Sequence, residues 1–217
     1  MHQDAQLLAD LDPKGEPILH LYDWSRPAAT YGYFLEPARH VKGTEVELAR
    51  RSTGGGIVFH LWDLAFSFLM PADHPNCSQN TLENYRFVNR IVLDAVEEIF
   101  SMKGSLIPEN AEPKGPHCAN FCMARPTIYD AVYRGMKVAG AAQRRTRRGF
   151  LHQGSISLAL PDPALLERVL VESDEIAAAM AVYSFAPLGN APTPQALRDA
   201  RQEIQAKLAQ KFALAVD

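Results

Sequence analysis

The order of strand-like and helical segments constrains the fold of this chain more than any other feature. Strand-like runs come in two groups, and the first long helical segment separates them. Strands grouped in this way do not form the alternating βαβ units of a parallel sheet. We therefore predict a single-domain α+β fold, with a largely antiparallel or mixed central sheet flanked by helices. The predicted strands span residues 18–22, 28–34, 57–60 and 64–70 before the helix, and 128–132, 136–142 and 154–160 after it.

The clearest helical prediction covers residues 78–100. Apolar residues recur there at helical spacing, and Ser78 or Asn80 can cap the first turn. A shorter helix is predicted around residues 5–11, before a turn of Asp, Pro, Lys and Gly.

The residues after Ile156 are expected to form two helices and a connection. The first covers residues 163–171. The second is amphipathic and extends to Lys211, with Thr193 as its cap and Pro194 in the first helical position.

Composition excludes several classes of protein. The 217 residues are enough for one large domain with a substantial core. The 22 basic and 25 acidic side chains give a net charge of −3, which disfavours a globally basic nucleic-acid binder. No run approaches the ~18–20 apolar residues that span a bilayer. The first residues also lack the basic start and apolar run of a secretory signal. We expect a cytoplasmic protein that binds neither membrane nor nucleic acid.

The three cysteines, Cys77, Cys118 and Cys122, do not suggest a disulfide framework, because their number is odd. His117, Cys118 and Cys122 lack a fourth ligand at a spacing typical of zinc sites, so no metal is expected. What remains to be decided is whether one of these thiols is a nucleophile.

The segment from Arg50 to His60 is the first candidate for a functional site. Consecutive glycines at 54–56 allow positive φ angles and let the backbone pass close to a ligand. Arg50 and Arg51 could bind a phosphate or polarise a carbonyl. A flexible hairpin with exposed charges is the alternative interpretation.

The second candidate is Lys137, which lies among small and apolar residues between Gly135 and Gly140. A lysine on such a strand must reach solvent or face a pocket, because an unpaired buried ammonium is costly. Residues 131–161 contain no acidic side chain but six basic ones, which would attract an acidic partner. A solvated, arginine-rich loop at 144–148 is the alternative.

Together these segments resemble the lipoate–protein ligase and octanoyltransferase family. The run from Arg50 to His60 is similar to that family's Arg-Arg-x-Ser/Thr-Gly-Gly-Gly/Arg-x-Val-x-His signature. Residues 135–143 resemble its Gly-x-Lys-x-x-Gly-Ser/Ala-Ala-Gln segment, and Gly154-Ser155-Ile156 resembles the strand that follows. The resemblance implies a fold like that of biotin and lipoate protein ligases. It also implies that substrate is bound by Arg50, Arg51, Ser52, Thr53, Gly54, Gly55, Gly56, His60, Gly140, Ala141, Ala142, Gly154 and Ser155.

Residues 121–130 resemble the Cys-x-x-x-Pro-Ser-x-Tyr-Glu segment of the cysteine-dependent octanoyltransferases, with Cys122 four residues before Pro126. The resemblance implies that Cys122 accepts an octanoyl or lipoyl group from acyl carrier protein as a thioester, with Lys137 as the second catalytic residue and no cofactor. The acceptor would be a lysine of a lipoyl domain or of the glycine-cleavage H protein. A small buried apolar role is the alternative for Cys122.

Two other functions stay open. An ATP-dependent lipoate–protein ligase would use free lipoate, ATP and Mg²⁺, and would form lipoyl-adenylate beside Lys137. Such ligases often carry a C-terminal accessory domain, which we do not expect within residues 1–217. The chain could instead be a non-catalytic binder of lipoyl domains or acyl carriers, because Leu61 and the order His152-Gln153 depart from the family pattern. A monomer is expected from the resemblance.

Overall fold

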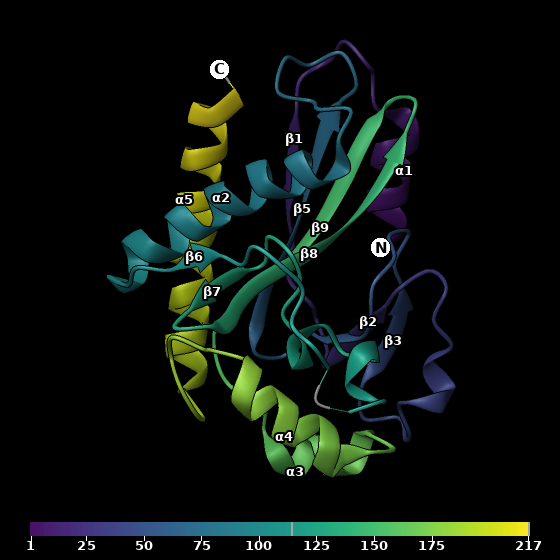
Figure 1. The fold of residues 1–217 in the computed structure, drawn as a ribbon, viewed down its shortest axis with the longest axis vertical. Helices are drawn as coiled ribbons and strands as arrows, with labels where there is room; N and C mark the ends of the chain where they lie inside the picture. The colour runs from purple at the N-terminus through teal and green to yellow at the C-terminus, as the bar shows by residue number, and fades with distance from the viewer. Residues whose placement is uncertain (114, 217) are drawn as a thin grey trace.

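The main feature of the computed structural model, which describes residues 1–113 and 115–216, is a six-stranded sheet (Figure 1). Its order is β1-β5-β9-β8-β7-β6, and every neighbouring pair is antiparallel. A smaller sheet has the order β3-β2-β4 and contains a parallel pair, β2 with β3. The strands are β1 (Ile18–Leu21), β2 (Ala28–Tyr31), β3 (Glu47–Arg50), β4 (Val58–Phe59), β5 (Asp63–Pro71), β6 (Ser105–Leu106), β7 (Ala131–Tyr133), β8 (Met136–Thr146) and β9 (Gly149–Ser157). The predicted α+β fold is confirmed.

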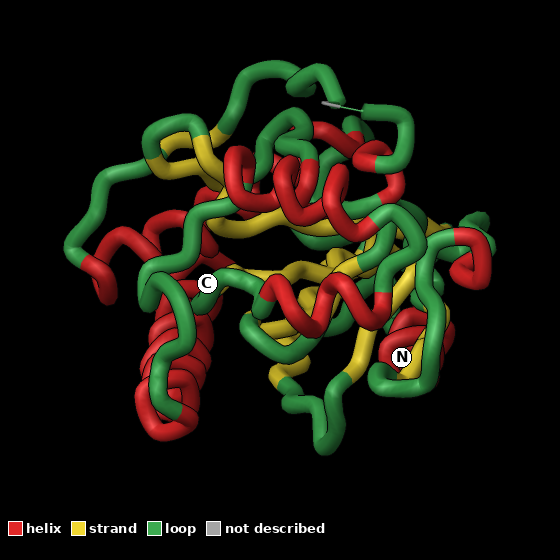
Figure 2. The backbone as a smooth tube through the Cα atoms, turned by 90° about the horizontal axis from the view of Figure 1, so that it is seen from below, coloured by secondary structure: helices red, strands yellow, loops and turns green. Residues whose placement is uncertain are grey.

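Helices flank the sheets. The longest is α2, whose first turn is capped by Asn80, since its side-chain oxygen accepts the N–H of Leu82 at 3.0 Å. The helices α3 and α4 pack on each other at the lower end of the molecule in Figure 1, which is nearest the viewer in Figure 2. The α-helices are α1 (His2–Asp10), α2 (Thr81–Phe100), α3 (Pro163–Val169), α4 (Ser173–Tyr183) and α5 (Pro194–Val216), and the 3-10 turns are η1 (Pro37–Arg39), η2 (Cys118–Asn120) and η3 (Cys122–Ala124).

The largest core lies between the six-stranded sheet and the helices α2 and α5. Every residue of β5 and β9 is buried, because these central strands are covered on both faces. Ile204, Leu208 and Phe212 recur every four residues along α5 and place one apolar stripe against that core. Apolar burial of this kind is the main favourable term in folding.

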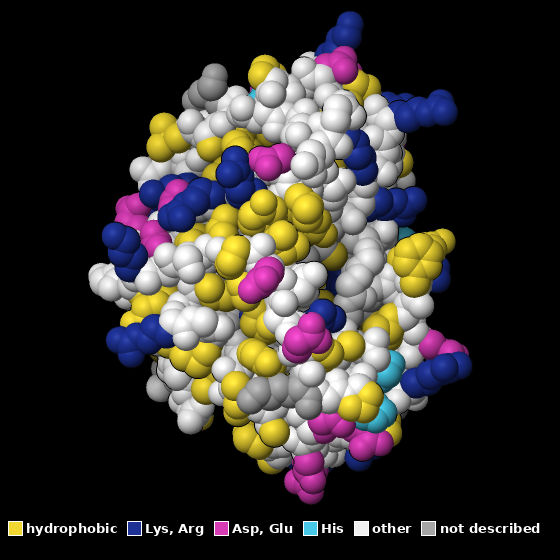
Figure 3. Space-filling view, viewed as in Figure 1, with side chains coloured by type: hydrophobic (Ala, Val, Ile, Leu, Met, Phe, Trp, Pro, Cys, Tyr) yellow, Lys and Arg dark blue, Asp and Glu magenta, His cyan; other side chains and the backbone are white. Residues whose placement is uncertain are grey.

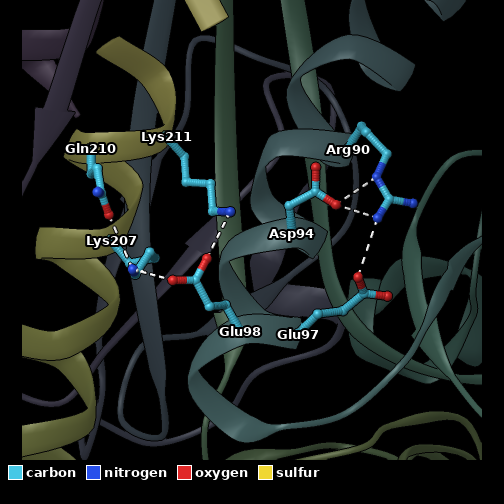
Figure 4. Close-up of polar contacts among 7 residues, drawn as sticks. All are labelled: Arg90, Asp94, Glu97, Glu98, Lys207, Gln210 and Lys211. Carbon is cyan, nitrogen blue, oxygen red and sulfur yellow. Dashed lines mark hydrogen bonds and ion pairs between the residues drawn. The ribbon is translucent and has the colours of Figure 1, made fainter. Parts of the chain in front are cut away.

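Ion pairs join the exposed sides of α2 and α5 (Figure 4). Glu98 of α2 pairs with Lys207 and Lys211 of α5, and hydrogen bonds from both lysines lower the pKa of Glu98 to about 2. Arg90 pairs with Asp94 and Glu97 within α2. Because such surface pairs are screened by water, the apolar stripe of α5 stabilises the helix contact more than they do.

A second core supports the smaller sheet. It contains apolar residues of β2 and β4, of α3 and α4, and of the segment around η2 and η3. The isolated bridge between Ile57 and Phe121 joins this segment to the end of the glycine run. The polypeptide around Cys122 is therefore held between the two sheets.

The structure corrects some boundaries of the predicted elements. Residues after Ile156 form α3, α4 and α5, so the expectation of two helices was wrong. Both α4 and α5 show little amphipathic contrast, but Thr193 and Pro194 mark the start of α5, whereas α4 begins without a side-chain cap and was therefore missed. The strand predicted at 136–142 extends to Thr146, because its arginines pair with β9 in the hairpin. Among the described residues, no helix has the length and apolar character needed to cross a membrane.

Two leucines of α5 offer a test of which surface holds this helix in place. Leu208→Ala, at a fully buried position, should lower the free energy of unfolding by about 2–5 kcal/mol, because it leaves a cavity in the core. Leu214→Ala on the same helix is 73% exposed and should change it by less than about 0.5 kcal/mol. Urea titration followed by circular dichroism measures both, and equal losses would contradict this assignment.

Candidate active site

A cavity of about 170 Å³ lies between the glycine run, the strands β8 and β9, and the segment around η2 and η3. Both candidate catalytic residues, Cys122 and Lys137, line it. The other lining residues are Met1, Tyr22, Thr30, Arg51, Gly55, Gly56, Val58, His60, Ala119, Phe121, Met123, Arg125, Thr127, Gly140, Ala141, Ala142, Gln153, Gly154 and Ser155.

Arg51 holds the glycine run in its turn. Its Nη2 donates to the carbonyl oxygens of Gly54, at 3.1 Å, and Gly56, at 2.7 Å. Gly55 between them has a φ of +88°, a conformation that favours glycine. The guanidinium therefore takes the place of the backbone partners that this irregular segment lacks.

Arg51 also begins a buried hydrogen-bond network. Its Nη1 donates to Thr30 Oγ1 at 2.7 Å, and this hydroxyl lies 2.7 Å from His60 Nε2. On the other side of the ring, His60 Nδ1 lies 2.8 Å from Asp63 Oδ2, which also accepts a hydrogen bond from Ser155 Oγ at 2.6 Å. A carboxylate only accepts, so in the neutral ring Nδ1 carries the proton and Nε2 accepts from Thr30.

Lys137 is 3% exposed and forms an ion pair with Asp130, with 2.7 Å between Nζ and Oδ2. The same ammonium donates to the carbonyl oxygen of Cys122 at 2.9 Å. A buried ammonium needs such partners, because removing it from water is costly. Two partners leave one of its three N–H groups for the cavity.

The lysine pair requires a glycine at position 140. A Cβ atom there would lie 2.5 Å from both Lys137 Nζ and Asp130 Oδ1, and any side chain would displace the pair. Asp130 is held in turn by Thr127, whose backbone N–H and hydroxyl donate to Oδ2 at 2.6 and 2.9 Å. Thus a short turn before β7 and one glycine of β8 together position the ammonium.

Cys122 lies beside the glycine turn. A Cβ atom added to Gly55 would be 3.7 Å from Cys122 Sγ. The Cys122 N–H donates to the Ile57 carbonyl at 3.1 Å, and Ile57 N–H donates to Asn120 at 2.7 Å, so the backbone on each side of the thiol is fixed. Cys77 and Cys118 line no part of this cavity, and burial raises the pKa of both.

The N-terminal helix reaches the same region through Asp4, which is fully buried. Its carboxylate accepts from Ser67 Oγ at 2.9 Å and from Gln153 Nε2 at 2.6 Å, and its other oxygen lies 2.7 Å from His20 Nδ1. Gln153 Oε1 accepts in turn from Thr53 Oγ1 at 2.8 Å. This path connects α1 to the start of the glycine run.

The structure divides the predicted substrate-binding residues. Arg51, Gly55, Gly56, His60, Gly140, Ala141, Ala142, Gly154 and Ser155 line the cavity. Four others, Arg50, Ser52, Thr53 and Gly54, do not. Arg50 stacks on the ring of Tyr33, Ser52 and Gly54 line a separate surface hollow, and buried Thr53 bonds to Gln153.

Several residues of the site were not identified from the sequence. Thr30 is an ordinary strand residue there, and Asp4 lies far away in the chain, so neither gives a local signal. Asp63 and Asp130 could have been found, because each stands at a fixed spacing from a motif residue, His60 or Cys122.

The two departures from the family pattern have structural explanations. Leu61 replaces an aspartate, but Asp63 supplies the carboxylate that orients His60. His152 and Gln153 point to opposite faces of β9, as neighbours in a strand do. Gln153 lines the cavity, whereas His152 packs between Tyr85 and Phe66 on the side of α2.

Complete burial lowers the pKa of His152 to about 3. Its Nδ1 lies 2.8 Å from Gln143 Nε2, and its Nε2 has no hydrogen-bond partner among the described residues. The ring is therefore neutral in the folded protein.

Within the described part of the chain, no group of three or more His, Cys, Asp or Glu side chains could hold a metal ion. The thiol of Cys122 and the buried ammonium of Lys137 both belong to residues that line this cavity.

Residues 1–210 match the family model described as the lipoyl protein ligase A/B catalytic domain. The octanoyltransferase LipM of Carboxydothermus hydrogenoformans is 30% identical over 172 residues, which are 77% of this chain and 62% of that relative. LipM of Bacillus subtilis is 28% identical over 182 residues, or 80% of this chain and 65% of that relative. The chain thus spans less than two thirds of either relative's length.

Solved structures share the fold. Lipoate-protein ligase A bound with ATP superposes with a TM-score of 0.71 and 20% identity, over 98% of this chain and 77% of that one. The bipartite lipoate protein ligase of Thermoplasma acidophilum was solved in a study with its E2 lipoyl domain. It superposes with a TM-score of 0.69 and 20% identity, over 98% of this chain and 76% of that one. At this identity the likeness describes the fold.

The neutral His152 makes stability depend on pH. In the unfolded chain its pKa returns to about 6.5, so below that value the unfolded state binds a proton that the folded state does not bind until about pH 3. Between about pH 7.5 and pH 5 this group should cost the wild type about 2 kcal/mol of unfolding free energy. The unfolding free energy of His152→Phe should therefore fall by about 2 kcal/mol less than that of the wild type over the same pH range.

The matched control is His2→Phe, at an exposed position, which should keep the wild-type pH dependence. Urea titrations of the three proteins at the two pH values give the comparison. Parallel pH profiles for wild type and His152→Phe would show that the buried imidazole is not the cause.

Proposed function

This chain belongs to the lipoyl protein ligase A/B catalytic domain family, and we propose that it transfers an octanoyl or lipoyl group from an acyl carrier protein to a lysine of a lipoyl-carrier domain. The proposed intermediate is a thioester on Cys122. One observation carries the proposal: Cys122, Lys137 and the turn at Gly55 line the same cavity.

The first step is an exchange between thioesters. The Cys122 thiolate attacks the carbonyl carbon of the donor, a new S–C bond forms, and the donor's thiol leaves with the electrons of the broken C–S bond and takes up a proton. Both sides of this exchange are thioesters of similar energy, so no ATP is needed.

In the second step the acceptor amine attacks the acyl-enzyme. A C–N bond forms, the bond between carbon and Cys122 Sγ breaks, and the sulfur takes a proton that the amine loses. In both steps the carbonyl oxygen gains negative charge. Lys137 lines the cavity, and its third N–H would stabilise that oxygen, because the ammonium is fixed in advance by Asp130 and the Cys122 carbonyl.

The partners follow from this chemistry and from the relatives. Octanoyltransferase LipM relatives support an octanoyl donor, and the similar archaeal ligase was studied with an E2 lipoyl domain. We propose a lipoyl domain as acceptor, with the glycine-cleavage H protein as a second acceptor.

The cationic side chains of the cavity favour transfer over ATP-dependent ligation. Arg51 donates to the glycine turn and Thr30, Arg125 Nε donates to the Ala111 carbonyl at 2.7 Å, and Lys137 pairs with Asp130. These internal partners occupy part of the hydrogen-bonding capacity of each cation, so fewer donors are free for a triphosphate, whereas a neutral acyl thioester needs only one at its carbonyl oxygen. The ligase and the non-catalytic binder remain outcomes of the experiment below.

Intact-mass spectrometry tests the nucleophile. After incubation with octanoyl-acyl carrier protein, the wild type should gain one octanoyl group that hydroxylamine removes. Cys122→Ser should gain none that hydroxylamine removes rapidly, because the thiol is gone. Cys77→Ser, which changes a cysteine outside the cavity, should be modified like the wild type.

The other outcomes identify the alternatives. If the wild type gains no adduct but lipoate and ATP together modify a lipoyl domain, the protein is a ligase. If it binds the carrier without any turnover, it is a binding module. An adduct that persists unchanged on Cys122→Ser would place the acyl group elsewhere.

The role of Lys137 needs a variant that keeps the fold. Lys137→Met alone leaves Asp130 buried without its partner, which should destabilise the protein by about 3–5 kcal/mol. The double variant Lys137→Met/Asp130→Asn removes both charges and should fold. We expect its rate of acyl-enzyme formation to fall by about 10²–10³, the usual loss for one oxyanion donor.

Rapid quenching followed by intact-mass spectrometry gives the rate of acyl-enzyme formation, and circular dichroism checks the fold. A folded double variant that acylates at the wild-type rate would show that Lys137 is a structural residue.

A further inference from the structure

A second hollow, of about 270 Å³, lies on the surface next to the catalytic cavity. It is lined by Tyr33, Phe34, Ser52, Gly54, Gln143 and Arg144. None of these residues lines the cavity that contains Cys122. The hollow therefore needs an explanation of its own.

The aromatic side of the hollow is unusually exposed. Phe34 is 91% exposed and Tyr33 46%, and their rings form an edge-to-face pair with centroids 5.1 Å apart. Arg50 lies over the Tyr33 ring at 4.8 Å. Exposed aromatic and arginine side chains of this kind are enriched in binding surfaces.

The polar side of the hollow contains a hydroxyl without a partner. Ser52 lines the hollow, and its Oγ is buried and has no hydrogen-bond partner among the described residues. Buried polar atoms are usually satisfied, so this hydroxyl points to a ligand that supplies the missing group.

Arg144 gives the hollow a positive charge. It is exposed, and its single hydrogen bond among the described residues is a long one, 3.4 Å, to the Ser52 carbonyl. Among the residues that the structure describes, no acidic side chain lines the hollow. The other arginines of the stretch 131–161 lie elsewhere: Arg145 bonds to Ser78 and Gln79, and Arg148 to Leu11. On the face in Figure 3, Lys and Arg side chains are scattered among other side chains.

The hollow adjoins the catalytic cavity along both of its walls. Gly54 lines the hollow and the next residue, Gly55, lines the cavity, while Gln143 lines the hollow and the preceding Ala142 lines the cavity. A Cβ atom on Gly54 would have no neighbour within 4 Å, so the space above the turn is open. A thin, flexible ligand can pass from the hollow over this glycine to Cys122.

We propose that the hollow binds the phosphopantetheine arm of the acyl donor, an inference that rests on the proposed function. The phosphate of the arm pairs with Arg144 and the Ser52 hydroxyl, and its methyl-bearing carbon packs on Phe34. These groups of the arm thus meet an exposed guanidinium, a hydroxyl without a partner and an exposed aromatic ring.

The arm fits better than the surface of the acceptor domain. The acceptor has no phosphate, so it would leave Arg144 without its best partner.

Binding of acyl carrier protein in two forms tests this site. The holo form carries the arm without an acyl group, and the apo form ends in the unmodified serine. Fluorescence anisotropy should show the wild type binding the holo form about tenfold or more tightly than the apo form, as expected for a charge-assisted hydrogen bond to phosphate. Arg144→Gln should lose this preference.

The matched control is Arg147→Gln, which removes the same charge from an exposed position outside the hollow and should keep the preference for the holo form. Phe34→Ala should weaken holo binding and leave apo binding unchanged. The proposal would be overturned if Arg144→Gln weakened the binding of holo and apo acyl carrier protein equally. It would also be overturned if the wild type bound both forms with the same affinity.

A second measurement separates donor from acceptor. Starting from preformed acyl-enzyme, Arg144→Gln should transfer its group to a lipoyl domain at the wild-type rate, and a slower transfer would assign the hollow to the acceptor instead. The binding measurement does not need the thiol, so Cys122→Ser should keep the holo preference. If acyl transfer fails while that preference remains, the arm site stands and the proposed function does not.

Discussion

The buried ion pair between Lys137 and Asp130 is the interaction on which the rest of the site depends. An ammonium at 3% exposure is tolerated only with a carboxylate at 2.7 Å, and that carboxylate is itself fixed by Thr127. The pair excludes a side chain at Gly140 and also binds the carbonyl of Cys122. The positions of the strand β8, the turn before β7 and the thiol segment are therefore linked through one nitrogen atom.

Polar groups in the rest of the site mainly position the backbone. The signature motif suggested Arg51 as a ligand for substrate. In the structure its guanidinium donates hydrogen bonds to the glycine turn and to Thr30. His60 and Asp63 continue that network toward Ser155. A rigid scaffold of this kind holds a reactive geometry in advance, which is how an electrostatic site lowers a barrier without reorganising during the reaction.

Much of the fold could be predicted, because it follows from local patterns. Runs of apolar residues marked β5 and the central strands, the cap at Asn80 marked α2, and the grouping of strands indicated an antiparallel sheet. The alanine-rich α4 was missed, since it has neither a side-chain cap nor a clear contrast between its faces, whereas α5 was marked by its cap residues. The parallel pairing of β2 with β3 also lies beyond local signals, because pairing is decided between segments distant in the chain.

The sequence by itself determined which chemical groups this protein can offer: a thiol, a lysine among small residues, and a glycine run that tolerates positive φ. Those properties belong to individual side chains and to short stretches of backbone. The tertiary structure alone decided which of these groups meet, that Asp130 neutralises Lys137, that Asp4 reaches Thr53 through Gln153, and that Ser52 faces a different hollow from Gly55. The physical reason is that hydrogen bonds and ion pairs act over a few ångströms, and only the folded chain brings side chains within that range, such as those of Asp4 and Gln153, which are 149 positions apart.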